Sequence, residues 1–179
     1  MDTLPDPIVI TADDPGPEFV SIGHGFHARL SRSRFGTALP SPDSVAVGVA
    51  AITGETVVPQ PATAANAIGL TAQMPMRAVY LTSGDARTFH IGAQTLELRQ
   101  AEAWKLAWPD ELAGVALRAL IWAGPNGIDA VLPQVIDRLP PDTRSRLVAP
   151  DPERPAWLAH RLARLAGGNR ACTATTSRG

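Results

Sequence analysis

Residues 59–100, PQPATAANAIGLTAQMPMRAVYLTSGDARTFHIGAQTLELRQ, decide how the chain folds. Residues 61–68 are mostly small helix-forming side chains, and they end at Gly69, the residue type that most often closes a helix in the left-handed conformation. Three runs of β-forming residues follow, and the last of them alternates polar and apolar side chains, which is typical of a strand with one solvated face. The stretch therefore predicts a short helix and then a three-stranded antiparallel meander, with strands over residues 78–82, 88–91 and 95–99.

Helical periodicity replaces this alternation after Pro109. Apolar residues at spacings of three and four predict a helix over residues 110–123 that ends at Gly124. Residues 167–179 have no apolar pattern, and we predict that they form a disordered tail. The fold class predicted from the sequence is thus α+β, an antiparallel β-meander with a helical C-terminal half, whose further helices lie over residues 128–139, 143–148 and 155–166.

The N-terminal part predicts a tail, a hairpin and a helix. Prolines and acidic residues dominate residues 1–18, which we predict to be a tail. Two apolar runs within residues 19–30 surround the glycine-rich turn at residues 23–25, so a β-hairpin is expected there. Ser41 as the N-cap residue and Gly54 just past the last apolar position predict a helix between them.

Composition narrows the functional classes. The 179 residues are 45% hydrophobic, enough for one core of ordinary size, and no apolar run approaches the roughly 20 residues that a bilayer span requires. The acidic N-terminus does not resemble a secretion signal and the chain contains a single cysteine, so we expect a soluble cytoplasmic protein. Five acidic residues occur in residues 1–28, and seven arginines in residues 138–170. Such a basic excess can contact nucleic acid or an acidic partner, but it is also typical of the solvated side of a helix.

The sequence contains none of the common catalytic motifs. A P-loop, GxGxxG, HExxH and GxSxG are all missing, and we predict no catalytic, cofactor-binding or metal-binding residue. One remote alternative is a metal-dependent nuclease that uses Asp85 and Glu97, because carboxylates on adjacent strands followed by a cation can hold a divalent metal. The cation here is Arg99, and an alternating strand places glutamate and arginine on its solvated face in any case.

Several blocks together resemble the AbiEi-type antitoxins of type IV toxin–antitoxin systems, in a short bacterial branch. The resemblance extends over roughly residues 20–166. The blocks occur in the order and spacing of that family, and together they are more specific than any one alone. They are ATAANAIGLTAQ (residues 62–73), RAVYLTSG (77–84), RT (87–88), IGAQT (91–95) and ELR (97–99).

The resemblance implies two parts with different roles. Such proteins join an N-terminal winged helix, which binds the promoter of the operon, to a C-terminal α/β domain that counteracts a nucleotidyltransferase toxin. Residues 19–40 resemble the wing and exit strand, so they would form the remnant of a winged helix. The recognition helices would need on the order of fifty residues before the wing, and about eighteen precede it here. The implied organisation is a tail (1–18), a hairpin (19–40), an antitoxin-like domain (41–166) and a tail (167–179).

Two hypotheses follow from this resemblance. In the first, the chain is an antitoxin that opposes its toxin without catalysis, and the candidate partner contacts are Asn66, Gln73, Thr82 and Arg99. In the second, it is a DNA-binding autorepressor of its own operon, and the candidate nucleic-acid contacts are His24, Arg29, Arg32 and Arg34.

Overall fold

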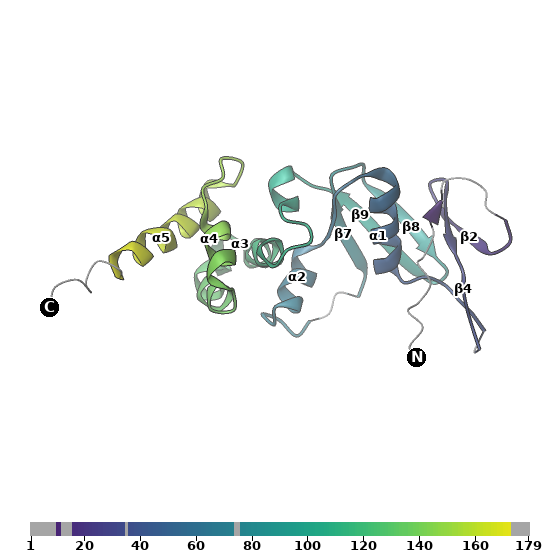
Figure 1. The fold of residues 1–179 in the computed structure, drawn as a ribbon, viewed down its shortest axis with the longest axis horizontal. Helices are drawn as coiled ribbons and strands as arrows, with labels where there is room; N and C mark the ends of the chain where they lie inside the picture. Colours follow the sequence, from purple (N-terminus) through teal and green to yellow (C-terminus); the bar gives the residue numbers. More distant parts are fainter. Residues whose placement is uncertain (1–9, 12–15, 35, 74–75, 173–179) are drawn as a thin grey trace. The chain divides into compact units, whose positions relative to one another are not determined.

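The computed structural model of the chain describes residues 10–11, 16–34, 36–73 and 76–172 (Figure 1). Its internal contacts form two compact units. Unit 1 consists of the described residues within Met1–Pro59 and Pro75–Ala101, and unit 2 of those within Gln60–Met74 and Glu102–Gly179. The chain therefore leaves unit 1 after Pro59, returns to it, and enters unit 2 again after Ala101. Residues 41–166, predicted as one domain, contribute to both units.

Unit 1 contains nine strands and one helix among its described residues. Four of the strands form a mixed sheet in the order β6-β7-β9-β8, and the other five form the sheets β1-β3-β2 and β4-β5. The elements are β1 (Ile10–Thr11), β2 (Phe19–Gly23), β3 (Phe26–Arg29), β4 (Ser31–Ser33), β5 (Gly36–Ala38), α1 (Pro42–Thr53), β6 (Val57–Pro59), β7 (Ala78–Thr82), β8 (Arg87–Ile91) and β9 (Gln94–Gln100).

The predicted strands are present, but the meander is wrong in its pairing. β8 and β9 form the expected antiparallel hairpin, with Thr88 opposite Glu97. β9 then pairs in parallel with β7, from Ala78 opposite Leu96 onwards, so it lies between β7 and β8. The alternation along β9 determines which side chains face the core, and it carries no information about which strand lies on either side. β6, a three-residue strand that the sequence did not reveal, completes the sheet by pairing antiparallel with β7.

Helix α1 packs against this sheet and closes the core of unit 1. It begins where predicted: Ser41 is the N-cap residue, and its side chain accepts a hydrogen bond from the backbone N–H of Ser44. It ends at Gly54 in the left-handed conformation (φ 71°), also as predicted. Side chains of α1, the mixed sheet and the β2–β3 hairpin share one apolar core. Its buried members are Ile22, Phe26, Ala28, Val45, Ala46, Val49, Phe89, Ile91, Leu96 and Leu98.

The predicted hairpin over residues 19–30 is confirmed as β2 and β3, with an irregular register between Ser21 and Gly23. Its second strand does not continue to Arg34. Instead, β4 and β5 form a separate two-stranded ribbon in which Arg32 lies opposite Thr37. The predicted tail over residues 1–18 lies mostly outside the described residues, apart from β1, which pairs with β3, and residues 16–18.

Unit 2 is helical, which confirms the predicted helical C-terminal half. Gly124 (φ 65°, ψ −179°) interrupts α3, so the predicted division into two helices at this glycine is confirmed. The helices share a second apolar core, which includes Leu117, Leu132 and Leu158. No helix in the described part of the chain is long and apolar enough to span a bilayer. The elements are α2 (Pro61–Ala67), η1 (Ala103–Leu106), α3 (Leu112–Asp137), α4 (Pro141–Val148) and α5 (Ala156–Cys172).

The predicted end of the last helix is wrong. The sequence predicted a stop at Gly167 and a tail from there, but α5 continues to Cys172. Glycine inside a helix is less favourable than alanine by about 1 kcal/mol, and that penalty alone does not end a helix. The remainder of the predicted tail, residues 173–179, lies outside the described residues.

Candidate functional site

Strands β8 and β9 of the mixed sheet have one polar face, which we call the open face. Leu96 and Leu98 of β9 point into the core, so the side chains that alternate with them point the other way. The register places Thr88 of β8 beside Glu97 and His90 beside Thr95 on this same side. The open face therefore consists of side chains that form hydrogen bonds and ion pairs. They are Thr88, His90, Thr95, Glu97 and Arg99.

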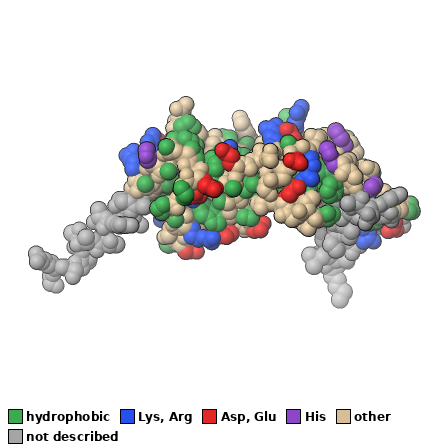
Figure 2. All heavy atoms as spheres, turned by 90° about the horizontal axis from the view of Figure 1, so that it is seen from above, with side chains coloured by type: hydrophobic (Ala, Val, Ile, Leu, Met, Phe, Trp, Pro, Cys, Tyr) green, Lys and Arg blue, Asp and Glu red, His purple; other side chains and the backbone are tan. Residues whose placement is uncertain are grey.

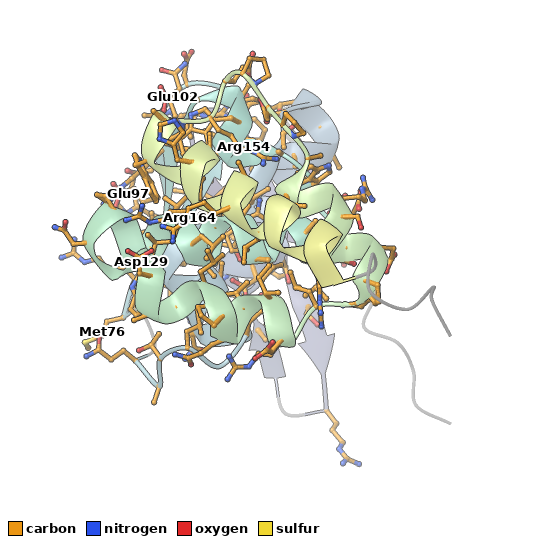
Figure 3. The ribbon with its side chains drawn as sticks, turned by 90° about the vertical axis from the view of Figure 1, so that its left-hand side faces the viewer. Met76, Glu97, Glu102, Asp129, Arg154 and Arg164 are labelled. Carbon is orange, nitrogen blue, oxygen red and sulfur yellow. The ribbon has the colours of Figure 1, made fainter. Side chains whose placement is uncertain are left out.

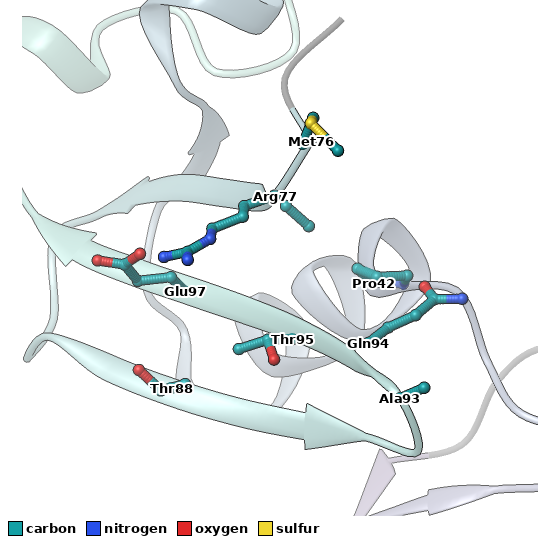
Figure 4. A pocket seen from close by; sticks show the side chains of 9 residues that line it. Pro42, Met76, Arg77, Thr88, Ala93, Gln94, Thr95 and Glu97 are labelled. Carbon is teal, nitrogen blue, oxygen red and sulfur yellow. The ribbon is translucent and has the colours of Figure 1, made fainter.

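A cavity of about 700 Å³ lies over the open face (Figure 4). Most of its lining comes from the start of β7, from the β8–β9 turn and from β9. A neighbouring hollow of about 600 Å³ shares Thr88 and Glu97 with it, and we call the two together the depression. The cavity is lined by Pro42, Met76, Arg77, Ala78, Thr88, Ala93, Gln94, Thr95 and Glu97. The second hollow is lined by His24, Ala86, Arg87, Thr88, Glu97, Leu98, Arg99 and Gln100.

Two arginines lie on either side of Glu97. Arg99 donates to both carboxylate oxygens, from Nε to Oε1 at 2.7 Å and from Nη2 to Oε2 at 3.2 Å. Arg77 extends over β9 toward the same carboxylate (Figure 4). The hydrogen bonds from Arg99, and then the charges of Arg99 and Arg77, lower the pKa of Glu97 below its usual value, although desolvation opposes them. Glu97 is therefore a carboxylate at neutral pH, and its hydrogen-bonding capacity is already partly used.

His24 closes one side of the second hollow. It lies in the β2–β3 turn with φ 54°, between two glycines. Its Nε2 is 3.1 Å from the carbonyl oxygen of Thr88, close enough to donate a hydrogen bond, and its ring meets the Phe89 ring edge to face at 5.5 Å between centroids. The imidazole therefore attaches the β2–β3 turn to β8, at the rim of the depression.

A half-buried ion pair between Glu55 and Arg87 holds one of the arginines that line the second hollow. The sequence did not predict this pair. The carboxylate of Glu55 accepts hydrogen bonds from Thr82 Oγ1 (2.8 Å) and from Nη2 of Arg87, which lines the second hollow. The backbone N–H of Gly84 donates to Thr82 Oγ1 at 3.0 Å. A Cβ atom at Gly84 would overlap the Glu55 carboxylate, so any larger residue there would force this carboxylate to move. No short-range pattern could have revealed this network, because Glu55 precedes its two partners by 27 and 32 residues.

The four predicted partner contacts lie in three different environments. Arg99 is exposed on the open face. Thr82 is fully buried beneath it, with its hydroxyl group bonded to Glu55. In unit 2, Asn66 Nδ2 donates to the carbonyl oxygens of Thr71 (3.0 Å) and Gln73 (3.4 Å), which holds the loop after α2 in place. Of the four residues, only Arg99 lines the depression in unit 1.

The four predicted nucleic-acid contacts all belong to unit 1. His24 is bonded to β8, and Arg29 lies at the end of β3 with Nη2 3.9 Å from a carboxylate oxygen of Glu18. Arg32 and Arg34 belong to the β4–β5 ribbon, and Arg34 is exposed at its turn. On the face of the molecule seen in Figure 2, cationic and anionic side chains are interspersed. The four residues come from three segments, namely the β2–β3 turn, the end of β3 and the β4–β5 ribbon.

The two carboxylates of the nuclease alternative are separated. Asp85 lies in the turn before β8, three residues ahead of Thr88, which is the residue opposite Glu97. Within the residues that the structure describes, no group of three or more His, Cys, Asp or Glu side chains could hold a metal ion. The geometry gives no support to a two-carboxylate metal site.

Unit 2 contains buried cations with a structural role. Arg118 of α3 is fully buried and donates to the carbonyl oxygens of Ala107 (3.3 Å) and Pro109 (3.5 Å). Burial lowers the pKa of Arg118 to about 10. Arg154 (Figure 3) donates to the carbonyl oxygens of Leu147 and Ala149, at the end of α4. Both arginines satisfy backbone acceptors, so they stabilise loops.

Comparison with known proteins gives one family. No curated protein and no solved structure matches the chain. A family of unknown function, DUF6088, matches residues 17–144, which make up well over half of the sequence and include every strand and residue of the depression described above. The chain therefore belongs to the DUF6088 family of unknown function.

Proposed function

We propose that this protein is the antitoxin of a type IV, AbiE-like toxin–antitoxin system, and that it counteracts a nucleotidyltransferase toxin in the cytoplasm without catalysing a reaction. One observation carries the proposal. Four of the five sequence blocks that resemble AbiEi-type antitoxins lie in unit 1, and each of the four contributes residues to its depression. Seven of the nine residues that line its larger cavity belong to those blocks, and only Pro42 and Met76 do not.

The chemistry of the depression suits binding. Its polar side chains are threonine hydroxyls, glutamine amides, arginines, the His24 imidazole and one carboxylate bonded to arginine. Such groups donate and accept hydrogen bonds across an interface, and they need no cofactor or metal to do so. Arg87, which lines the depression, is held from behind by Glu55. A preorganised polar surface of this kind loses little conformational entropy when a partner binds.

Co-expression tests the proposal. The proposal requires a nucleotidyltransferase gene in the same operon, whose product should arrest growth of a host when induced alone, and the full-length protein should restore growth. Thr95→Arg, which fills the cavity from its exposed floor, should abolish the protection. Gln134→Arg adds the same side chain at an exposed position of α3 and should protect like wild type. Growth arrest that persists with the wild-type protein would overturn the proposal.

A second candidate function is that of a DNA-binding autorepressor. The observation that favours it is the β4–β5 ribbon, which carries two arginines within four residues, Arg32 and Arg34. Two-stranded ribbons can enter a DNA groove, and arginines bind its phosphates. A mobility shift on the operon's promoter at physiological salt tests this function, with Arg32→Ala/Arg34→Ala as the variant. A wild-type protein that does not shift the promoter would exclude it.

A further inference from the structure

Arg77 differs from the other arginines of the depression in having no counter-ion of its own. Arg99 is bonded to Glu97, and Arg87 is bonded to Glu55. The guanidinium of Arg77 is exposed, and it makes no hydrogen bond or ion pair with any residue in the described part of the chain. Its planar group therefore offers five N–H donors above the cavity in the geometry that matches a carboxylate.

An apolar group lies directly beside this cation. Met76 is fully exposed, with a relative accessibility of 101%, and it lines the same cavity as Arg77. Figure 3 shows its side chain projecting away from the ribbon. Methionine is enriched at protein interfaces, where its flexible thioether adapts to the shape of an opposing apolar side chain. Exposed hydroxyls of Thr88 and Thr95 surround the pair with groups that hydrogen-bond to a partner's backbone.

We infer that the depression binds an acidic segment of a protein partner, in which a carboxylate pairs with the Arg77 guanidinium and a neighbouring apolar side chain packs on Met76. Identifying that partner as the toxin rests on the proposed function, but the binding chemistry does not. Charge complementarity carries the inference: once the pairs Arg99–Glu97 and Arg87–Glu55 are formed, one positive charge remains over the cavity.

A nucleic-acid strand fits the same surface less well. Glu97 lies on the floor of the depression and would repel each phosphate of a continuous backbone. Met76 gives an apolar contact but no aromatic surface on which a base could stack. A protein segment with one well-placed carboxylate avoids both problems.

A peptide-binding measurement tests the inference independently of any toxin. The probe is a fluorescein-labelled dodecapeptide of repeating Glu-Leu-Glu-Ser, titrated with the full-length protein and followed by fluorescence anisotropy. Arg77→Glu should weaken binding about tenfold or more, since it replaces a charge-assisted hydrogen bond by repulsion. Arg77→Glu should also bind a peptide with lysine in place of glutamate better than wild type does. Glu97→Gln should strengthen binding of the acidic peptide, because it removes a negative charge from the floor of the cavity.

Arg164→Glu is the matched control, because it makes the same charge reversal at an exposed arginine of α5 in unit 2 (Figure 3). Its peptide affinity should equal that of wild type, and circular dichroism of every variant establishes that it is folded. Failure of the wild-type protein to bind the acidic peptide would overturn the inference. Equal losses for Arg77→Glu and Arg164→Glu would also overturn it, as would Arg77-dependent binding of a single-stranded oligonucleotide in preference to the peptide. Peptide binding without rescue from the toxin would refute only the proposed function.

Discussion

Replacing Gly84 by alanine should destabilise unit 1 through a single carboxylate. The added Cβ atom would occupy the position of the Glu55 carboxylate, so this side chain must move. Its hydrogen bonds with Thr82 Oγ1 and with Arg87 would be broken together. Thr82 is fully buried and Arg87 only 16% exposed, so neither side chain can replace the lost bond fully with water.

The expected magnitude follows from the burial of this ion pair. Removing one partner of a fully buried pair costs about 3 to 5 kcal/mol. The Glu55 and Arg87 side chains retain 18% and 16% of their exposure, which reduces the expected loss to about 2 to 3 kcal/mol. For a chain of this length, such a loss lowers the melting temperature by about 4 to 12 °C.

Urea unfolding followed by circular dichroism measures the effect, and the chain offers a matched control. Gly127→Ala makes the same substitution inside α3, where the new Cβ atom would only touch the Cβ of Ala123 at 3.7 Å. It should leave the free energy of unfolding unchanged or raise it by about 0.5 to 1 kcal/mol.

A double-mutant cycle decides whether Glu55 is the cause. In a Glu55→Ala background, the space that the new Cβ requires is already empty, so Gly84→Ala should cost much less than it does in the wild type. Wild-type stability for Gly84→Ala would refute the reasoning. An equal loss in both backgrounds would refute it as well, because the damage would then not pass through the carboxylate.

Three further predictions concern individual elements. Gly124→Ala should lower the free energy of unfolding by about 1 to 3 kcal/mol in urea titrations, because the φ and ψ angles at this break in α3 are accessible to glycine almost exclusively. Ser41→Ala should lower it by about 1 kcal/mol in the same assay, because α1 loses its side-chain cap. Burial, and then the hydrogen bond from Tyr80 to Asp43, raise the pKa of Tyr80 above its usual value. The contribution of Tyr80 to the free energy of unfolding should therefore be fully present below about pH 10. It should fall at higher pH, where tyrosine ionises in the unfolded chain but not in the folded one. Melting temperatures of the wild type and Tyr80→Phe between pH 8 and 11 should differ by less and less as the pH rises.

Local chemistry allowed most elements to be predicted from the sequence. The cap at Ser41, the left-handed glycine at position 54 and the interruption at Gly124 each depend on residues within one or two turns, and all three were located correctly. The alternation along β9 likewise identified its solvated face, and with it the exposed position of Arg99. Such features depend on the preferences of single residues and on their nearest neighbours in the chain.

Features that join distant segments were not predictable in this way. β9 pairs in parallel with β7, although β8 lies between them in the sequence. The alternation of polar and apolar residues along β9 would be the same whether its neighbour were β7 or β8 alone, so it could not reveal this pairing. The bond between Glu55 and Arg87 joins residues 32 positions apart. Arg77 and Met76 were visible in the sequence, but only the cavity that they line distinguishes them from other surface residues.

No single cut in the chain can separate the two units. A fragment that ends after β9 still contains α2, but it lacks α3, the helix against which α2 packs, and so leaves Ile68 and Leu70 without their core. A fragment that begins at Glu102 lacks α2 in turn. Recombination at one position in the gene therefore cannot transfer either unit alone to another protein. A version of the protein split into two fragments would therefore have to be divided inside a loop of one unit, so that both connections between the units stay intact.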